Sequence, residues 1–257
     1  MLVIQVCGLI TPYKFTIALE LTAATCDPNS LKELIDSCIS GLYQAGIRVR
    51  AITSDMGPLN KGIWNLIGIK ANRRINPHPS ALLKLLLAEH CYKKFCYEFQ
   101  KLEEPIYFFA DPTHLFKLIR NELITHDLHL PAWVKNAYHI DKGKCIVSWR
   151  WIQRLYNIQQ SCYYRLAYKI TPNHLHPSSF EKMRVNLVFH IFSEQTSAAF
   201  KTCIAKKLIP EDATAPAILC KQVSRWFKLI NNRLPILALH KDHETENKKH
   251  LICYFNL

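Results

Sequence analysis

Two aspartates directly follow apolar, β-prone runs, and their carboxylates are candidates for chemistry. Asp55 comes after the run 47–53 and is followed by the turn residues Gly57 and Pro58. A carboxylate held at the end of a buried strand suits a Mg²⁺ ligand, because it is anionic, hard and fixed on a rigid element. The same position also suits an Asx-turn or a helix N-cap, and the sequence leaves both interpretations open.

Asp111 ends the second such run, 106–109, and a helix is expected to begin directly after it. On that helix His114, Lys117 and Asn121 are three or four residues apart, so they share one face. This pattern fits a polar site beside a sheet. It fits a capped helix with a solvated face equally well.

Several common reaction classes lack their sequence signatures. The chain has no GxxxxGK[ST] or GxGxxG loop and only 7 glycines, so a phosphate site would have to use side chains and helix ends. It has no GxSxG, HExxH or cysteine-nucleophile pattern. The 10 cysteines include no CxxC pair, which argues against a zinc ribbon or a redox motif. We interpret Cys91 and Cys96 as buried thiols and residues 240–253 as a solvated, His- and Lys-rich tail.

The elements that must position these residues alternate between strand and helix in the first half of the chain. Ser30 followed by Glu33 is a capping box that predicts the start of a helix, and Gly46 would close it. The predicted order is β-β-α-β-α-α-β, with the acids at strand ends, where open α/β sheets place ligands. Strands are predicted over 2–7, 15–20, 47–53 and 106–109, and helices over 30–46, 61–66 and 80–99.

Helical periodicity replaces the strand signals after Asp111. Besides the helix that follows Asp111, helices are predicted over 149–156, 178–200 and 214–230. We therefore expect an α/β region over residues 1–110, followed by a mostly α region over residues 111–257.

The net charge is +13, and it is unevenly distributed. Residues 1–110 hold 12 Lys and Arg against 9 Asp and Glu, whereas residues 111–257 hold 21 against 11. A basic second half favours polyanionic partners such as DNA through counterion release. The longest apolar stretches, such as 81–88, fall far short of the roughly 20 residues of a membrane helix. We therefore expect an intracellular protein with no membrane partner.

Six short segments, taken in order, resemble the P-element type of DNA transposase, a family that includes the THAP-domain transposases. Three of them are the predicted hairpin and the segments around Asp55 and Asp111. The ordered set makes the resemblance specific, and it covers nearly the whole chain. The other three segments read YKITPNHL over 168–175, FEKMRV over 180–185 and FHIFS over 189–193.

The resemblance implies an RNase H-like catalytic domain interrupted by a helical insertion that binds GTP. In that family an Asp-Asp-Glu triad holds two Mg²⁺ ions, which activate water and then a DNA 3′-hydroxyl for phosphoryl transfer. Asp55 would be the second aspartate of the triad, and so a catalytic and metal-binding position. Lys169 and Arg184 would meet the GTP phosphates. Val185 would add backbone or packing contacts, and Ser193 would donate a hydrogen bond.

The chain departs from the family at the other two acids. The family's first aspartate lies on a strand before the hairpin, and its glutamate lies on a helix after the insertion. We therefore expect an incomplete RNase H-like mixed sheet without its first strand, and a helical insertion domain truncated at its C-terminus. The hairpin would then pair directly with the 47–53 strand, or the sheet would be loosened. One carboxylate cannot offset the repulsion of two Mg²⁺ ions about 4 Å apart, so we expect no catalysis.

The chain also departs from the family where guanine is read. The family uses an Asp-x-x-Asn element after a phenylalanine, whereas the corresponding stretch here, 231–238, reads NNRLPILA. A carboxylate that pairs with the N1–H and N2–H₂ groups supplies much of guanine selectivity. We therefore expect GTP binding to be weak or lost.

Three interpretations of function remain open. The first is an inactive, nuclear remnant of a transposase that retains some DNA or nucleotide binding. The second is a domesticated DNA- or nucleotide-binding module that also forms homo-oligomers. The third is a Mg²⁺-dependent nuclease that recruits Asp111 or another acid to complete a site at Asp55.

Overall fold

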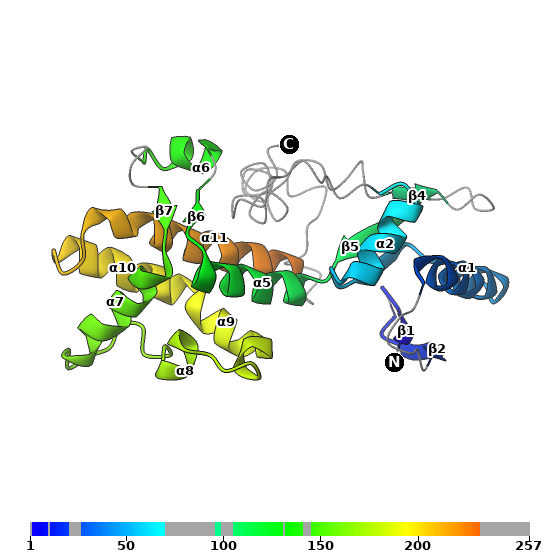
Figure 1. The fold of residues 1–257 in the computed structure, drawn as a ribbon, viewed down its shortest axis with the longest axis horizontal. Coiled ribbons are helices and arrows are strands. Elements are labelled where there is room, and N and C mark those ends of the chain that lie inside the picture. Colours follow the sequence, from blue (N-terminus) through cyan, green and yellow to red (C-terminus); the bar gives the residue numbers. More distant parts are fainter. Residues whose placement is uncertain are drawn as a thin grey trace. The chain divides into compact units, whose positions relative to one another are not determined.

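The computed structural model describes the chain in several stretches and divides it into two compact units (Figure 1). The described residues are 2–9, 11–20, 27–69, 96–98, 105–130, 132–140 and 145–231. The first unit, here called the sheet unit, contains Met1–Arg73 and Cys91–Asp111. The second, the helical unit, contains Arg74–His90 and Pro112–Leu257.

A β-hairpin opens the sheet unit, as the sequence predicts. β1 (Leu2–Cys7) pairs antiparallel with β2 (Lys14–Glu20), and the register shifts once, between Ile4 and Gln5. Side chains along β1 alternate between half-buried and exposed. This period of two is the pattern of a strand with one covered face.

A second, three-stranded sheet carries both aspartates. β3 (Ala51–Ser54) runs parallel to β5 (Pro105–Ala110), and β4 (Cys96–Glu98) is antiparallel to β5 on its other side. Among the described strands, the hairpin forms a sheet of its own, so the expected direct pairing between the hairpin and β3 is wrong.

β3 is shorter than the predicted 47–53 strand, because the chain before it closes the preceding helix. The Ile47 N–H donates to the Leu42 carbonyl at 2.8 Å and the Gly46 N–H to the Tyr43 carbonyl at 3.0 Å. Gly46 has φ +79°, which a residue with a Cβ adopts only with strain. Together these bonds form a Schellman motif, which confirms Gly46 as the end of the helix.

Two helices cover the apolar side chains of this sheet. α1 (Pro28–Gln44) and α2 (Pro58–Leu66) are both longer at their start than predicted. A proline at the first turn of each begins the helix early, since its missing N–H needs no partner there. The core cluster of buried residues comprises Ile39, Trp64, Ile69, Ile106 and Phe108.

Two predictions for the sheet unit need correction. The capping box is wrong: Ser30 lies inside α1, and the N-cap is Asp27, which makes no side-chain cap hydrogen bond. The predicted 80–99 helix is wrong over Cys96–Glu98, which pairs with β5 as β4. Ladder hydrogen bonds with a buried neighbour there override the local helical periodicity. The remainder of that predicted helix, over 80–95, lies outside the described residues, as do Cys91 and the 240–253 tail.

The helical unit begins with α5 (Pro112–Thr125) directly after the sheet. A two-stranded ribbon, β6 (Leu128–His129) with β7 (Ile146–Val147), brackets α6 (Ala132–Ala137). α7 (Trp149–Gln160) follows β7, and it extends four residues beyond the predicted 149–156 helix.

The remaining helices run from residue 172 to residue 230. They are α8 (Pro172–Leu175), the 3₁₀ turn η2 (Glu181–Met183), α9 (Val185–Ile191), α10 (Glu194–Ala205), the 3₁₀ turn η3 (Glu211–Ala213) and α11 (Thr214–Ile230). The bounds of α11 are those predicted. The single predicted 178–200 helix is wrong. It breaks at Arg184 and again at Ser193, both of which have extended backbone.

Aromatic packing joins the long helices of this unit. The Phe116 ring on α5 stacks on Phe227 of α11 at a centroid distance of 4.2 Å and tilts against Phe192 at 5.9 Å. Phe116 and Phe192 are fully buried. Such pairs stabilise the core by about 1 kcal/mol beyond the area they bury. Among the described residues, no helix is long and apolar enough to span a membrane.

Candidate functional site

Asp55 follows β3, as the sequence predicts, and its side chain orders the turn into α2. Its Oδ1 accepts hydrogen bonds from the Gly57 N–H and from Asn60 Nδ2, each at 2.8 Å. A Cβ on Gly57 would lie 2.9 Å from this oxygen, so a larger residue there would displace the Asp55 carboxylate. The Asx-turn interpretation of Asp55 is therefore confirmed, and one carboxylate oxygen is already occupied by two donors.

The sheet brings Asp111 to the same edge. Ser54 lies opposite Ala110 in the parallel register, and the Asp111 N–H donates to the Ser54 carbonyl at 2.7 Å. Asp55 and Asp111 are therefore the first residues after the last paired positions of the two parallel strands β3 and β5. Carboxyl ends of neighbouring parallel strands are where ligands of α/β sheets bind.

This edge does not supply a full ligand set for two Mg²⁺ ions from the described residues. No group of three or more His, Cys, Asp or Glu side chains in the described part of the chain is arranged to hold a metal ion. Two adjacent divalent ions need several anionic ligands to offset their repulsion. Asp55 and Asp111 by themselves therefore do not meet the needs of two Mg²⁺ ions.

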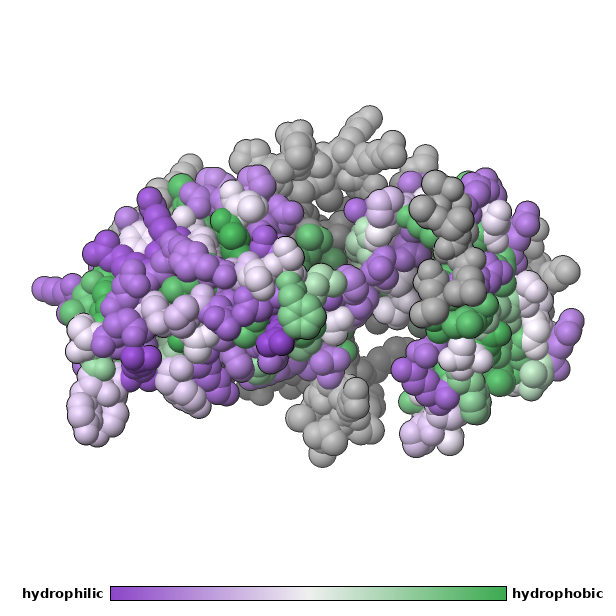
Figure 2. All heavy atoms as spheres, turned by 60° about the horizontal axis from the view of Figure 1, so that its bottom comes forward, coloured by the Kyte–Doolittle hydropathy of each residue, from purple (hydrophilic) through white to green (hydrophobic). Residues whose placement is uncertain are grey.

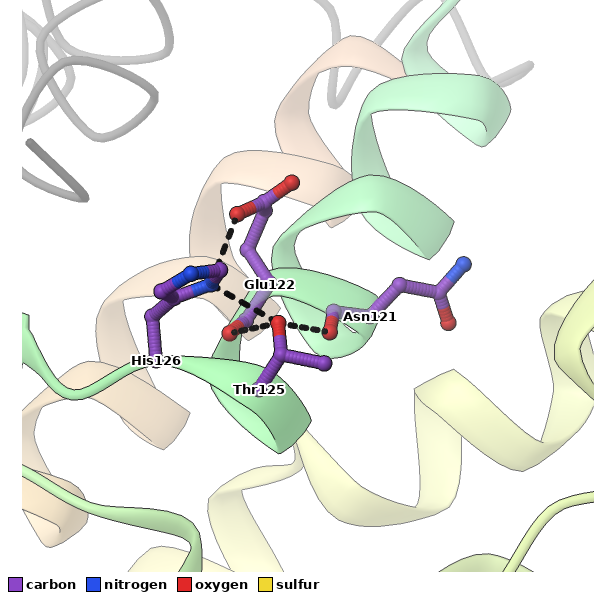
Figure 3. Close-up of polar contacts among 4 residues, drawn as sticks. All are labelled: Asn121, Glu122, Thr125 and His126. Atoms are coloured by element: carbon purple, nitrogen blue, oxygen red, sulfur yellow. Dashed lines mark hydrogen bonds and ion pairs between the residues drawn. The ribbon is translucent and has the colours of Figure 1, made fainter. Parts of the chain in front are cut away.

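The polar end of α5 makes helix-terminating contacts (Figure 3). Thr125 Oγ1 donates to the Asn121 or Glu122 carbonyl at 3.3 and 3.2 Å and lies 2.8 Å from His126 Nδ1. The same imidazole nitrogen is 3.4 Å from Glu122 Oε2. The Glu122 carbonyl also accepts from the His126 N–H at 2.8 Å, so these contacts add to the last helical bond and stabilise the end of the helix. For this part of α5, the interpretation as an ordinary helix end fits better than a binding site.

Arg120, on the same helix, is fully buried, and we did not predict a role for it. Its Nε donates to Asn121 Oδ1 at 2.9 Å and its Nη2 to the Lys182 carbonyl at 2.5 Å. Within the described residues its Nη1 has no hydrogen-bond partner, and burial lowers the pKa of the guanidinium. Arg120 thereby ties α5 to η2. Its place between Phe116, Ile119 and Leu123 on an apolar helix face was the signal in the sequence.

Two histidines, also absent from our prediction, form a hydrogen-bonded pair between α8 and α9. His174 on α8 is buried, and its Nε2 lies 3.1 Å from Nδ1 of His190 on α9. The Thr171 N–H donates to His174 Nδ1 at 3.0 Å. Burial, followed by the charge of His190, lowers the pKa of His174 to about 4. Burial and the nearby Lys169 also lower the pKa of His190.

The four residues that the resemblance assigns to GTP lie around the two ends of α9. Arg184 and Val185 begin the helix, and Ser193 follows its last turn. Lys169 is exposed and lies within electrostatic range of His190, near that same last turn. Arg184 is exposed as well, with its guanidinium 5.0 Å from the centre of the Phe180 ring.

Ser193 is the N-cap of α10. Its Oγ accepts from the Thr196 N–H at 3.1 Å and donates to the His190 carbonyl, also at 3.1 Å. Thr196 Oγ1 donates to the same carbonyl at 2.9 Å. The Ser193 hydroxyl, which the resemblance assigns to GTP, therefore caps α10 and holds the His190 carbonyl at the end of α9.

Cations gather where α10 packs against α11. Lys228 Nζ pairs with Glu194 Oε1 at 3.1 Å, and Arg225 and Lys221 lie close enough to Glu194 to lower its pKa further. Burial, then the charges of Arg225 and Lys201, lowers the pKa of Lys221. Hydrophilic residues cover much of the helical unit on the face drawn in Figure 2. The cations of α10 and α11 together form a cationic face that is suited to a polyanion.

The two units correspond to two transposase domain families. Residues 1–68 match the family described as TNP-like, RNase H N-terminal domain. Residues 113–243 match the family described as TNP-like, GTP-binding insertion domain. The class is therefore that of P-element-like transposases. Because the second match covers half of the chain, this protein belongs to the TNP-like family with a GTP-binding insertion domain.

Two relatives agree with this assignment. The Transposable element P transposase of Drosophila melanogaster is 26% identical over 208 residues, which are 81% of this chain and 23% of that protein. The structure of the Drosophila P element transposase strand transfer complex matches with a TM-score of 0.72 at 21% identity, covering 96% of this chain and 49% of that one. The chain thus spans less than half the length of these relatives. The structural likeness shows a shared fold.

Proposed function

We propose that the helical unit binds a guanine nucleotide and that phosphate contacts supply most of the affinity. The observation that carries this is the placement of two exposed cations, Lys169 and Arg184, around α9 in a family described by GTP binding. Cationic side chains suit a triphosphate, because charge-assisted hydrogen bonds are about twice as strong as neutral ones. The chain also lacks a glycine-rich loop that could take their place.

We expect little discrimination for the guanine base. The stretch that corresponds to the family's base-reading element lacks its aspartate, and residues 232–238 of it lie outside the described part of the chain. Without a carboxylate for the N1–H and N2–H₂ groups, GTP and ATP differ little in what they offer the protein. GTP and ATP should therefore bind with affinities within about tenfold of each other.

Titration of the full chain with a fluorescent N-methylanthraniloyl (mant) derivative of GTP tests the proposal. Lys169→Ala and Arg184→Ala should each weaken binding by about tenfold, the loss of one charge-assisted hydrogen bond. Lys206→Ala, an exposed lysine at the end of α10, is the matched control and should bind as the wild type does. Equal affinity of all four proteins would mean that the phosphates are held elsewhere.

DNA is a second candidate partner, favoured by the cationic face of α10 and α11. The like charges on this face repel one another, because the charges of Arg225 and Lys201 add to burial in lowering the pKa of Lys221. A DNA backbone would relieve that repulsion and release counterions. Filter binding over a salt series should give a steep negative slope that becomes shallower in Lys221→Ala/Arg225→Ala. A slope near zero for the wild type would eliminate this partner.

We further propose that this chain does not catalyse strand transfer by itself. We also propose that the sheet unit is an incomplete RNase H-like sheet and that the protein is nuclear. The first point rests on the two aspartates at the sheet edge, which are too few for two Mg²⁺ ions. A nicking assay with supercoiled DNA and Mg²⁺ should show no product. Nicking that Asp55→Asn abolishes would instead support a Mg²⁺-dependent nuclease using Asp55 and Asp111.

A further inference from the structure

The hydrogen-bond chain through the two histidines dictates where their protons lie. The Thr171 N–H can donate to His174 Nδ1 only when that nitrogen carries a lone pair. A neutral His174 then has its proton on Nε2, which lies 3.1 Å from His190 Nδ1. His190 Nδ1 is therefore the acceptor, and the proton of a neutral His190 must be on its Nε2.

The position of His190 is fixed as firmly as its tautomer. Its carbonyl accepts hydrogen bonds from the hydroxyls of Ser193 and Thr196, which belong to the start of α10. Its ring lies 5.3 Å from the buried ring of His174, centre to centre. His190 itself is only partly buried. A hydrogen-bond donor on this ring is therefore held rigidly at a surface that solvent reaches.

The other ring nitrogen of His190, Nε2, is available as a hydrogen-bond donor. In the described part of the chain, no hydrogen bond is formed by Nε2. Burial of the ring, followed by the charge of Lys169, disfavours the imidazolium and lowers the pKa of His190. A neutral N–H donor with an ammonium group within electrostatic range offers a mixed donor set for phosphate oxygens.

We propose that His190 is a further nucleotide-binding residue, which donates its Nε2–H to a phosphate oxygen beside Lys169, and that the buried His174 is the positioning residue that fixes the tautomer. The inference rests on the proposed nucleotide function of the same site. It adds a donor that the sequence does not reveal, since His174 and His190 are 16 residues apart and meet only through folding.

Nitrogen-detected NMR of the full chain tests the tautomers without any ligand. Both histidines should be neutral at pH 7.5, with the proton on Nε2. A proton on Nδ1 of His190, or a charged ring, would overturn the proposal whatever the nucleotide affinity.

Titration with mant-GTP tests the contact. His190→Ala should weaken binding by about tenfold, and His190→Gln, whose amide offers an N–H donor, should restore most of the loss. His174→Gln keeps an acceptor for Thr171 and a donor for His190, so it should bind nearly as the wild type does. His174→Ala frees the His190 tautomer and should weaken binding while the far-UV circular dichroism is unchanged. If His174→Ala unfolds the chain, the two His190 variants test the proposal.

The outcomes separate this inference from the proposed function. If the wild type binds mant-GTP and His190→Ala binds equally well, the role of His190 is wrong while the nucleotide function remains. If Lys169→Ala and His190→Ala both weaken binding and His190→Gln restores it, both are supported. If the wild type does not bind, both are overturned.

Discussion

Arg120 on α5 reaches across the helical unit, and its Nη2 lies 2.5 Å from the Lys182 carbonyl of η2. The two residues are 62 positions apart, yet this bond holds η2 immediately before Arg184. Burying a guanidinium costs solvation free energy, and among the described residues Arg120 donates its hydrogen bonds to neutral acceptors. Its two hydrogen bonds therefore point to a geometric role.

Replacing Arg120 should separate packing from hydrogen bonding. Arg120→Ala should lower the free energy of unfolding by about 2–4 kcal/mol, because it leaves a cavity and an unpaired Lys182 carbonyl. Arg120→Met refills the volume and removes the buried charge, so it should cost less than half as much. Urea unfolding followed by circular dichroism measures both. Equal losses for the two variants would contradict this account, and exposed Lys201→Ala is the control, expected within about 0.5 kcal/mol of the wild type.

Glycine substitutions at two positions should have opposite effects. Gly57→Ala places a Cβ 2.9 Å from Asp55 Oδ1 and should destabilise the protein by about 1 kcal/mol or more, as the Asx-turn opens. Gly41→Ala is the matched control, since a Cβ there meets nothing within 4 Å and Gly41 lies inside α1. It should stabilise the protein by about 0.5–1 kcal/mol through helix propensity. Thermal unfolding measures both, and a shift of the same sign for both variants would refute the argument.

Stability should fall as the pH drops below neutrality. Burial and His190 lower the pKa of His174 to about 4, against about 6.5 in an unfolded chain. Between these values the unfolded chain binds a proton that the folded protein refuses. The stability is therefore present above pH 6.5 and lost as the pH falls towards 4, by about 3 kcal/mol in all. The lowered pKa of His190 acts in the same direction.

Denaturant unfolding at pH 7.5 and pH 5 checks this dependence. His174→Gln cannot take up the proton, so its stability should change less between the two conditions than that of the wild type. Glu181 and Arg120 also act on His174 electrostatically, but they are shared by both proteins. Parallel losses in the two proteins would assign the pH dependence to other groups.

Ser193→Ala should weaken the start of α10. The hydroxyl caps Thr196 and bonds the His190 carbonyl, so its loss should cost about 1 kcal/mol. Thr202→Ala removes a hydroxyl that bonds only the Ala198 carbonyl within the same helix, and it should be neutral or slightly stabilising. Unfolding free energies compare the two. A smaller loss for Ser193→Ala than for Thr202→Ala would argue against the cap.

Local sequence patterns were sufficient where one element determined its own bounds. Residues 214–230 form α11 as predicted, and Gly46 ends α1, because helical periodicity and a glycine with positive φ act within a few neighbouring residues. The carboxylates at strand ends were predictable for the same reason. The ordered short segments also indicated the transposase family, which the domain matches confirm.

Helical periodicity failed at two places where a particular hydrogen bond decides the backbone. Cys96–Glu98 lies in a stretch whose sequence predicts a helix, but it pairs with β5. The 178–200 stretch breaks at Ser193, whose hydroxyl caps a new helix. Neither outcome follows from periodicity, since both depend on hydrogen bonds to a particular neighbour.

The sequence by itself determined the family, the basic second half, and the Asp55 and Asp111 positions after their strands. The tertiary structure alone decided that Asp55 and Asp111 share one edge, that Arg120 holds η2, and that His174 orients His190. The physical reason is the range of the interactions. Helix caps and periodicity act over a few residues, whereas parallel strand register and buried hydrogen bonds join residues that only folding brings together.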